Sequence, residues 1–231
     1  METSLHRELK DLYGGPDARR EARHGRYRID VIDGDELIEI QHASLASIRD
    51  KIRDLLQGHR VRIVKPIIAS KLLVKRHRKA GAVVERRMSP KRGRLIDIFD
   101  ELIYFTRVFP HPRLTLELVS VEIEEWRYPG HGRRRRYGQR DFEVEDQKLV
   151  SRGATWQLQT AADLIALVEA PLPAKFKTDE LAELLQIPRW LAQRIAYCWR
   201  EMGAVKCAGK CGNAHIYTAA APARRPRRRS A

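Results

Sequence analysis

Along the first 65 residues, the spacing of apolar residues changes from that of a helix to that of a strand and back again. Leu5, Leu9 and Leu12 recur at helical spacing, so a short helix is predicted, ended by Gly14. Alternation with a period of two follows, and then a second helical pattern and a strand rich in β-branched residues. The predicted order is helix, strands with a tight hairpin, helix and strand, at residues 4–13, 19–42, 44–56 and 59–68.

Beyond residue 66 the same patterns predict a second hairpin, one more amphipathic helix and a long pair of strands. These segments cover residues 67–88, 94–109, 113–128 and 143–158. From residue 160 to 218, three helical patterns precede a Gly-containing hairpin. The third helix follows Pro188, and its apolar stripe consists of Leu191, Ile195, Cys198 and Met202.

These patterns predict an α/β (α+β) fold divided into two domains. A central mixed sheet with its helices would occupy residues 1–157, and a small helical domain would occupy residues 158–219. Residues 220–231 have the basic low-complexity composition of a disordered tail.

The charge of the chain narrows the choice of partner. The 231 residues carry a formal net charge of +15, which favours binding to polyanions such as nucleic acid. We expect no membrane association, because no apolar run approaches the roughly 20 residues of a spanning helix. The first residues also lack the apolar region of a signal peptide, so a cytoplasmic, nucleoid-associated protein is expected.

Residues 28–41, RIDVIDGDELIEIQ, place two acids opposite each other. The Gly34-Asp35 dipeptide predicts a two-residue turn, which puts Asp30 opposite Glu39. Alternation places Ile29 and Val31 on the other, apolar face. Like charges that face each other across a strand pair repel, and a divalent cation would remove that repulsion. Mg²⁺ or Mn²⁺ bound by both carboxylates is therefore one interpretation, and acids on a solvent-exposed face, neutralised by Arg28, are the other.

The order of elements around these acids resembles the PD-(D/E)xK nuclease superfamily, which includes type II restriction enzymes. The resemblance covers about the first 65 residues and implies a restriction-endonuclease-like core. It also implies that Asp30 and Glu39 bind the metal, that Glu8 assists from the first helix, and that Gln41 occupies the position of the lysine.

Gln41 departs from the motif because its amide cannot carry the positive charge of lysine. Some members of the superfamily have Gln at this position, where it would position water. A lysine from a neighbouring element is the other solution, and Lys51 and Lys65 are the two candidates.

The three C-terminal helices and their hairpin resemble a winged helix-turn-helix domain. The whole chain also resembles an uncharacterised bacterial family with the same hairpin, the helix after SPKRGR and a C-terminal winged helix. In winged helices that bind DNA, the third helix enters the major groove. The resemblance therefore implies these DNA-binding candidates: Arg189, Trp190, Gln193, Arg194 and Arg200 on the helix, and Lys206 and Lys210 on the wing. A winged helix that contacts another protein is the alternative.

Two further features have competing interpretations. Cys207, Cys211 and His215, with or without Cys198, offer zinc ligands, but the spacing is not that of a common zinc finger, and buried thiols are the preferred interpretation. Basic runs at 91–94, 133–136 and 224–229 would contact phosphates or form solvated loops. Nearby aromatic residues that could stack on a base are Trp126 and Tyr137.

The sequence therefore predicts a Mg²⁺-dependent DNA endonuclease guided by a winged helix. The alternative is a non-catalytic DNA-binding protein or regulator with a degenerate nuclease fold. RNA as the nucleic acid and assembly as a homodimer both remain open.

Overall fold

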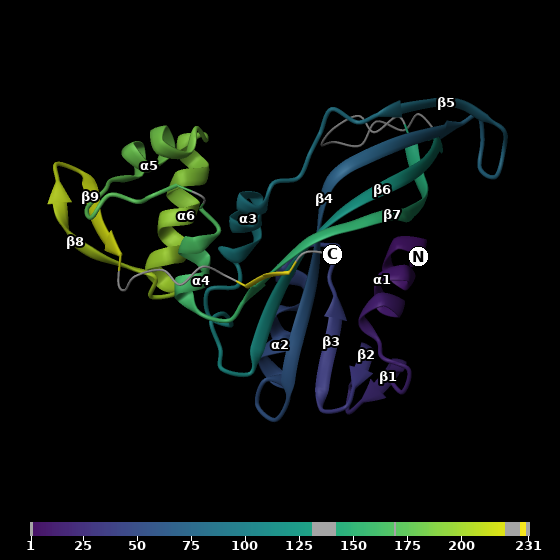
Figure 1. Cartoon of the computed structure of the whole chain (residues 1–231), viewed down its shortest axis with the longest axis horizontal. Coiled ribbons are helices and arrows are strands. Elements are labelled where there is room, and N and C mark those ends of the chain that lie inside the picture. Colours follow the sequence, from purple (N-terminus) through teal and green to yellow (C-terminus); the bar gives the residue numbers. More distant parts are fainter. Residues whose placement is uncertain (1, 131–141, 169, 220–226, 230–231) are drawn as a thin grey trace.

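One long mixed sheet runs through the computed structural model of the chain (Figure 1). The structure describes residues 2–130, 142–168, 170–219 and 227–229. The sheet has the strand order β1-β2-β3-β4-β6-β7-β10, and β5 pairs with the far end of β4. Its elements are α1 (Ser4–Tyr13), β1 (Arg19–His24), β2 (Tyr27–Asp33), β3 (Glu36–Ile40), η1 (Leu45–Ile48), α2 (Arg49–Leu55), β4 (Arg60–Arg76), β5 (Val83–Met88), η2 (Leu95–Ile98), α3 (Phe99–Leu102), β6 (Leu114–Pro129), β7 (Phe142–Leu158) and β10 (Arg227–Arg229).

β4 is the centre of the sheet and pairs in parallel with β3 on one side and with β6 on the other. Parallel neighbours need a crossover, and the segment from η1 to α2 supplies it between β3 and β4. The remaining pairs are antiparallel. The mixed α/β sheet that the sequence predicted is confirmed.

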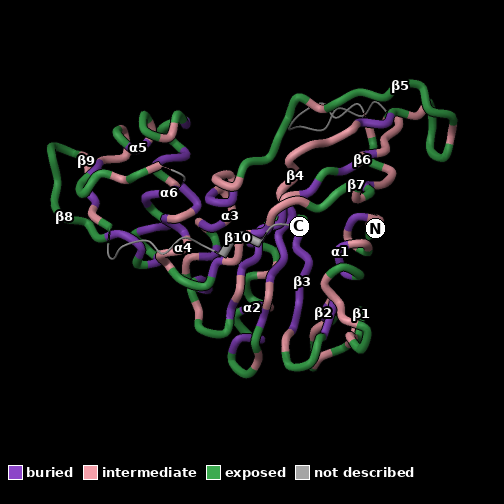
Figure 2. Tube along the Cα trace, viewed as in Figure 1, coloured by how far each residue is buried: buried purple, intermediate pink, exposed green. Residues whose placement is uncertain are grey.

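Both faces of the sheet are covered near its centre. On one face, the apolar stripe of α1 packs against β2, β3, β4 and β6 through Leu5 and Leu9. On the opposite face, α2 and α3 contribute Ile52, Leu55 and Phe99 to a second apolar cluster. Buried residues accordingly follow β3, β4 and β6, whereas every residue of β5 is exposed (Figure 2).

Three polar contacts attach α1 along its length. Ser4 Oγ donates to Asp146 at 2.7 Å, and Glu8 accepts a hydrogen bond from the Leu149 N–H at 2.7 Å. At the other end of the helix, the Tyr13 hydroxyl donates to Glu117 at 2.6 Å. α1 is therefore held to β6 and β7 and not only to the strands next to it in the sequence.

The β2–β3 hairpin has the predicted turn. Asp33 pairs with Glu36, and Gly34 has a φ of +56°, a left-handed conformation that glycine adopts without strain. The expected common face of Ile29 and Val31 is wrong, because Val31 lies in the cluster under α1 and Ile29 lies in the opposite cluster. The alternation of β2 is therefore broken at Asp30, between these two residues.

The helix predicted at residues 94–109 is much shorter than expected. A 3₁₀ segment, η2, precedes the four residues of α3, and turns follow. Phe99, Leu102, Phe105 and Val108 are buried at a spacing of three residues, and backbone bonds from Phe105 to Leu102 and from Val108 to Phe105 join successive turns. A spacing of three suits i to i+3 turns and explains why the α-helix does not continue.

Three helices and a hairpin form the C-terminal unit, as predicted. They are α4 (Ala161–Ala166), α5 (Thr178–Leu185), α6 (Arg189–Glu201), β8 (Val205–Cys211) and β9 (Ala214–Ala219). Phe176, just before α5, forms an isolated antiparallel bridge with Tyr217 on β9. This bridge closes the hairpin onto the helices.

The C-terminal unit packs on α3. The rings of Phe99 and Trp199 lie edge to face at 6.1 Å, and Arg194 on α6 donates to Asp100 on α3 at 2.9 Å. Trp199 also meets Phe176 edge to face at 6.1 Å. A single cluster of buried apolar residues therefore continues from α3 into the C-terminal helices.

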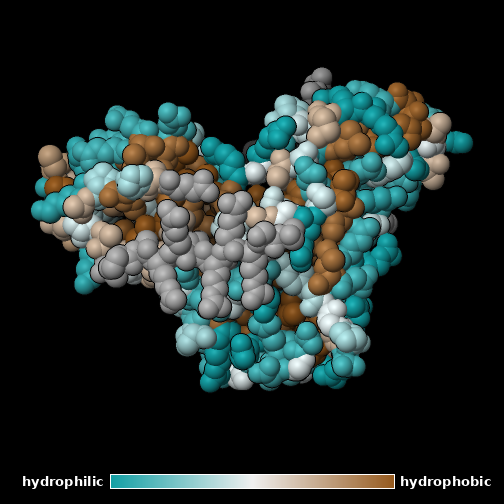
Figure 3. All heavy atoms as spheres, in the orientation of Figure 1, coloured by the Kyte–Doolittle hydropathy of each residue, from teal (hydrophilic) through white to brown (hydrophobic). Residues whose placement is uncertain are grey.

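Surface and terminal features complete the description. Hydrophilic residues cover most of the visible face, and apolar residues gather near β5, where Val83, Val84 and Met88 are exposed (Figure 3). Within residues 220–231, expected to be disordered, residues 227–229 form β10 beside β7. The 133–136 run and Tyr137 lie outside the described residues.

No helix in the described part of the chain is long and apolar enough to span a membrane.

The docking of α6 on α3 makes a prediction about stability. Trp199→Ala removes a fully buried ring, so we expect the free energy of unfolding to fall by about 3 to 5 kcal/mol in urea denaturation. Trp190→Ala on the same helix removes a half-exposed ring and should lower it by less than about 1 kcal/mol. Equal losses in the two variants would contradict the packing described here.

Candidate functional site

Asp30 and Glu39 lie where the β2–β3 ladder ends. The paired residues run from Asp33 and Glu36 to Val31 and Ile38. One step further, Asp30 Oδ2 accepts a hydrogen bond from the Ile40 N–H at 2.8 Å, and the Glu39 carboxylate accepts one from the backbone N–H of Asp30. The two acids are thus neighbours at the end of the ladder, but their side chains turn to different helices: Asp30 contacts His6 on α1, and Glu39 contacts Lys51 on α2.

Asp30 also contacts α1 through His6. The His6 Nε2 atom lies 3.2 Å from Asp30 Oδ1. Burial opposes ionisation of Asp30, but the hydrogen bonds from His6 and from the Ile40 N–H outweigh it and hold the pKa of Asp30 below its ordinary value. Asp30 is therefore an anion at neutral pH, oriented from both sides.

Glu39 is buried beneath α2 and faces Lys51. The Lys51 ammonium lies 2.5 Å from Glu39 Oε1 and also donates to the Arg28 carbonyl oxygen. Oε1 accepts no hydrogen bond of good geometry within the described structure. Burial raises the pKa of Glu39 to about 7, and the charge of Asp30 adds to the rise, while Lys51 opposes it. Glu39 therefore changes its charge near neutral pH.

Gln41 and Lys65 stabilise the loop after β3. The Gln41 amide donates to the Ser44 carbonyl at 2.8 Å and to Ser47 Oγ at 2.9 Å. Lys65 lies 2.9 Å from Glu101 on α3, and Glu101 also accepts a hydrogen bond from the Leu45 N–H. Of the two candidate lysines, Lys51 contacts Glu39, and Lys65 is bound to this loop and to α3.

Glu8 does not join the two acids, since its carboxylate is bonded to the Leu149 N–H on β7. A different group of residues, from α1, β1 and the segment before α1, lies beside Asp30. The ligand atoms of Glu2, His6 and Glu21 lie within 4.8 Å of one another, and the ammonium of Lys10 forms ion pairs with both glutamates. Lys10 already provides this cluster with a cation.

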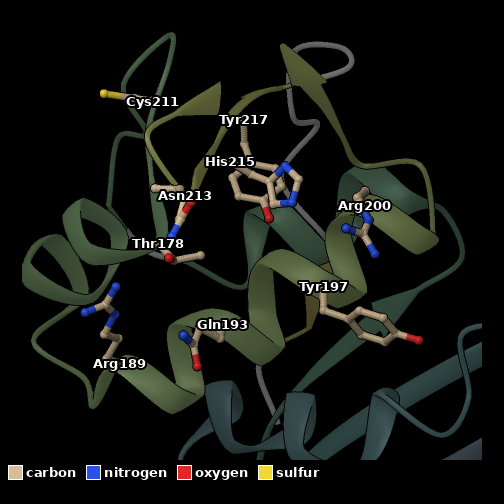
Figure 4. A pocket seen from close by; sticks show the side chains of 10 residues that line it. Thr178, Arg189, Gln193, Tyr197, Arg200, Cys211, Asn213, His215 and Tyr217 are labelled. Carbon is tan, nitrogen blue, oxygen red and sulfur yellow. The ribbon is translucent and has the colours of Figure 1, made fainter. Parts of the chain in front are cut away.

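A hollow of about 430 Å³ lies between α6, the start of α5 and the β8–β9 hairpin (Figure 4). Polar and aromatic side chains from all three elements surround it. Its lining residues are Thr178, Arg189, Gln193, Tyr197, Arg200, Cys211, Asn213, Ala214, His215 and Tyr217.

The predicted DNA-binding residues divide into three groups. Arg189, Gln193 and Arg200 line the hollow. Trp190 and Arg194 lie towards α3, where the guanidinium of Arg194 is 4.9 Å from the centre of the Trp190 ring and is paired with Asp100. The two wing lysines, Lys206 and Lys210, are exposed on β8.

Among the described residues, the cysteines do not form a cluster that could bind a metal ion. Cys207 and Cys211 are exposed on the hairpin, so the preferred interpretation of buried thiols is wrong for both. Cys207 Sγ lies 3.3 Å from His215 Nδ1. Cys198 is buried in α6, and burial raises the pKa of its thiol to about 12. In the described part of the chain, the cysteines provide no group of three neighbouring ligands.

His6, Lys10 and Glu21 are the site residues that the sequence did not identify. His6 and Lys10 are four residues apart and therefore share a helix face, which is a signal present in the sequence. Glu21 gave no signal, because its place depends on an unusual left-handed backbone with a φ of +51°.

Comparison with known proteins identifies relatives without an assigned activity. A family model described as "Domain of unknown function (DUF8091)" matches residues 3–159. A relative in Treponema pallidum (strain Nichols), named "Uncharacterized protein", is 27% identical over 183 residues, which is 79% of this chain and 72% of the relative. No solved structure matches. The family match covers the elements from α1 to β7 and ends before α4 begins.

The raised pKa of Glu39 predicts a pH-dependent stability. The folded pKa of about 7 exceeds the ordinary 4.5, so the folded protein binds the extra proton between these values. The free energy of unfolding, relative to that of Glu39→Gln, should therefore fall by up to about 3 kcal/mol as the pH rises through this range. Urea denaturation in EDTA at several pH values measures this difference.

Glu183→Gln is the matched control, because Glu183 is exposed on α5. Its stability should follow that of the unmodified protein at every pH. If Glu39→Gln also gave a parallel curve, the buried Glu39 would not be the group that titrates.

Proposed function

The chain belongs to the family described as "Domain of unknown function (DUF8091)". For this member of the family, we propose the activity of a metal-dependent nuclease acting on DNA. Asp30, Glu39 and Lys51 would form its site, and the C-terminal unit would hold the substrate. The observation that carries the proposal is the ion pair between Lys51 and Glu39, which supplies from α2 the positive charge that Gln41 lacks.

The strand order around these residues supports the same proposal. One helix, three antiparallel strands, a crossover helix and a parallel strand follow in the sequence, and their order in the sheet is β1-β2-β3-β4. The resemblance to the PD-(D/E)xK superfamily implied a core with this succession of elements. Asp30 and Glu39 stand on the two central strands of that unit.

The chemistry of the site fits a hard divalent cation. The Glu39 carboxylate is buried and paired with Lys51, and Asp30 on the neighbouring strand is an oriented anion. Mg²⁺ and Mn²⁺ bind carboxylate oxygens, and Asp30 and Glu39 are the residues that would hold the ion. When bound, the ion would polarise the phosphodiester and lower the pKa of a water molecule.

The protein side chains would have separate tasks. Lys51 would place a positive charge beside the anionic substrate, and its bond to the Arg28 carbonyl oxygen fixes its position. His6 would orient Asp30 from α1. Gln41 would hold the loop from residue 41 to 47 in shape, because its amide is bonded to Ser44 and Ser47.

The C-terminal unit has the features expected of a winged helix. Helix, bridge residue, two further helices and a hairpin occur in this order, and the bridge from Phe176 to Tyr217 joins the hairpin to the segment before α5. α6 carries Arg189, Gln193 and Arg200 on the surface beside the hairpin. Positive charge and hydrogen-bonding groups on one surface favour nucleic acid as the ligand.

A second candidate function has its own observation. Asp30, Glu39 and Gln41 each have polar partners within the protein, which could serve a structural role alone. This favours a DNA-binding protein or regulator that has kept the fold of a nuclease and lost its activity. Both candidates require DNA binding, and only the first requires cleavage.

Cleavage distinguishes these candidates. We expect the protein to cut plasmid or branched DNA in Mg²⁺ or Mn²⁺ and not in EDTA. Asp30→Asn and Glu39→Gln should each reduce the rate at least about 100-fold, since each removes a ligand for the ion. Lys51→Ala should reduce it to a similar extent by removing the charge near the phosphodiester.

Lys71→Ala is the matched control for Lys51→Ala. Lys71 forms a comparable pair with Glu125 at 2.6 Å, on β4 and β6 and not with either acid of the hairpin, so its loss should leave the rate within about twofold. Binding without cleavage would support the regulator instead. Cleavage that survives Glu39→Gln would place the active site elsewhere.

DNA binding should depend on salt and on the arginines of α6. Arg189→Gln and Arg200→Gln should each lower the slope of log affinity against log salt by about 0.9, if each arginine contacts one phosphate. Arg23→Gln, at an exposed position of β1, should change neither affinity nor slope. Fluorescence anisotropy in EDTA measures both, and an RNA strand of the same sequence tests the choice of nucleic acid.

A further inference from the structure

Two aromatic rings stand exposed on the helix assigned to DNA binding. Trp190 is 50% exposed and Tyr197 is 40% exposed, although aromatic side chains of this size usually bury most of their surface. They are seven residues apart on α6, so they share one side of the helix and lie about 10 Å apart along its axis.

An arginine accompanies each ring. The Arg194 guanidinium lies 4.9 Å from the centre of the Trp190 ring, and the Arg200 guanidinium lies 5.7 Å from the centre of the Tyr197 ring. Both arginines also pair with acids, Arg194 with Asp100 and Arg200 with Glu201, so their planes are held in place beside the aromatic side chains. The surface therefore combines half-exposed aromatic rings with positive charge.

The hollow beside Tyr197 adds groups that can bind one nucleotide. Gln193 and Asn213 carry amides, Arg189 carries a positive charge, and all three line the hollow together with Tyr197 (Figure 4). These amides can donate to and accept from the edge of a base, and the guanidinium can pair with a phosphate.

Such a surface differs from one that reads a duplex. Base edges in the major groove are read chiefly by Arg, Lys, Asn and Gln, and apolar contacts there are made to thymine methyl groups. Trp190 and Tyr197 would instead offer flat rings to the faces of bases, which are accessible only where the bases are unpaired. Arginine beside aromatic rings strengthens the binding of unpaired strands.

We propose that α6 binds unpaired nucleotides, with bases stacked on Trp190 and Tyr197 and one nucleotide in the hollow. This rests on the proposed function, because it takes DNA as the ligand, and it specifies the substrate class. The preferred substrates are single strands and duplexes that carry a single-stranded branch or overhang.

The test uses the full-length protein in EDTA, where it cannot cut with a bound metal ion. Fluorescence anisotropy compares one labelled DNA strand with the blunt duplex of the same sequence and with a duplex that ends in an overhang. We expect the strand and the overhang to bind at least about tenfold tighter than the blunt duplex.

Substitutions locate the binding surface. Trp190→Ala and Tyr197→Ala should each weaken binding of the single strand about tenfold and change binding of the blunt duplex little. Tyr104→Ala is the matched control, since Tyr104 is equally exposed but lies after α3, and it should bind every DNA as the unmodified protein does. Urea denaturation of each variant shows whether it is folded.

Tryptophan fluorescence is a second readout. A base stacked on Trp190 should quench part of the emission, and Trp190→Phe should bind the strand while losing that part of the quenching. Tighter binding of the blunt duplex, unchanged in Trp190→Ala and Tyr197→Ala, would overturn stacking and leave the proposed DNA binding intact. No binding to any of the three DNAs would overturn both.

Discussion

The parallel pairing of β3 with β4 is the constraint on which the rest of this structure depends. Parallel neighbours cannot be joined by a hairpin, so the chain must leave the sheet after Ile40 and return at Arg60. The crossover lays α2 over β3, which buries Glu39 and brings Lys51 to its carboxylate. Loop stability, the raised pKa of Glu39 and the position of the lysine all follow from this one connection.

Hydrogen bonds and basic partners explain how two acids can lie on neighbouring strands. Each carboxylate accepts a hydrogen bond from the backbone of the opposite strand, and each has a basic partner, His6 or Lys51. The repulsion expected between facing acids is therefore reduced by hydrogen bonds and positive charge. Glu39 still bears a penalty for burial, which makes it the acid most ready to exchange its proton for another cation.

Much of the fold follows from local patterns in the sequence. The turn at Gly34, the register of the hairpin and the three C-terminal helices are set by turn chemistry and by periodicity, which are visible along the chain. The helix expected at residues 94–109 was overestimated, because its apolar spacing of three residues was taken for a helical stripe.

The site was only partly predictable from the sequence, for a different reason. The turn places Asp30 and Glu39 one step beyond the last pair of the hairpin ladder, and this neighbourhood follows from the local pattern, whereas the direction of each side chain does not. His6 and Lys51 reach them from α1 and α2, and these contacts depend on how the helices pack on the sheet. The contact of Arg194 with Asp100 joins residues 94 positions apart, which no local pattern could indicate.

Asp100 and Glu101 are consecutive residues on α3, and their carboxylates bind partners in different parts of the chain. Asp100 holds α6 through Arg194, while Glu101 holds the loop after β3 through Leu45 and Lys65. α6 and the loop that follows Glu39 are therefore bonded to neighbouring residues of the same short helix, α3. Suppose that a ligand of α6 breaks the bond between Arg194 and Asp100 and thereby changes the affinity of the loop for a second ligand. By linkage, the second ligand then changes the affinity of α6 for the first ligand by the same factor.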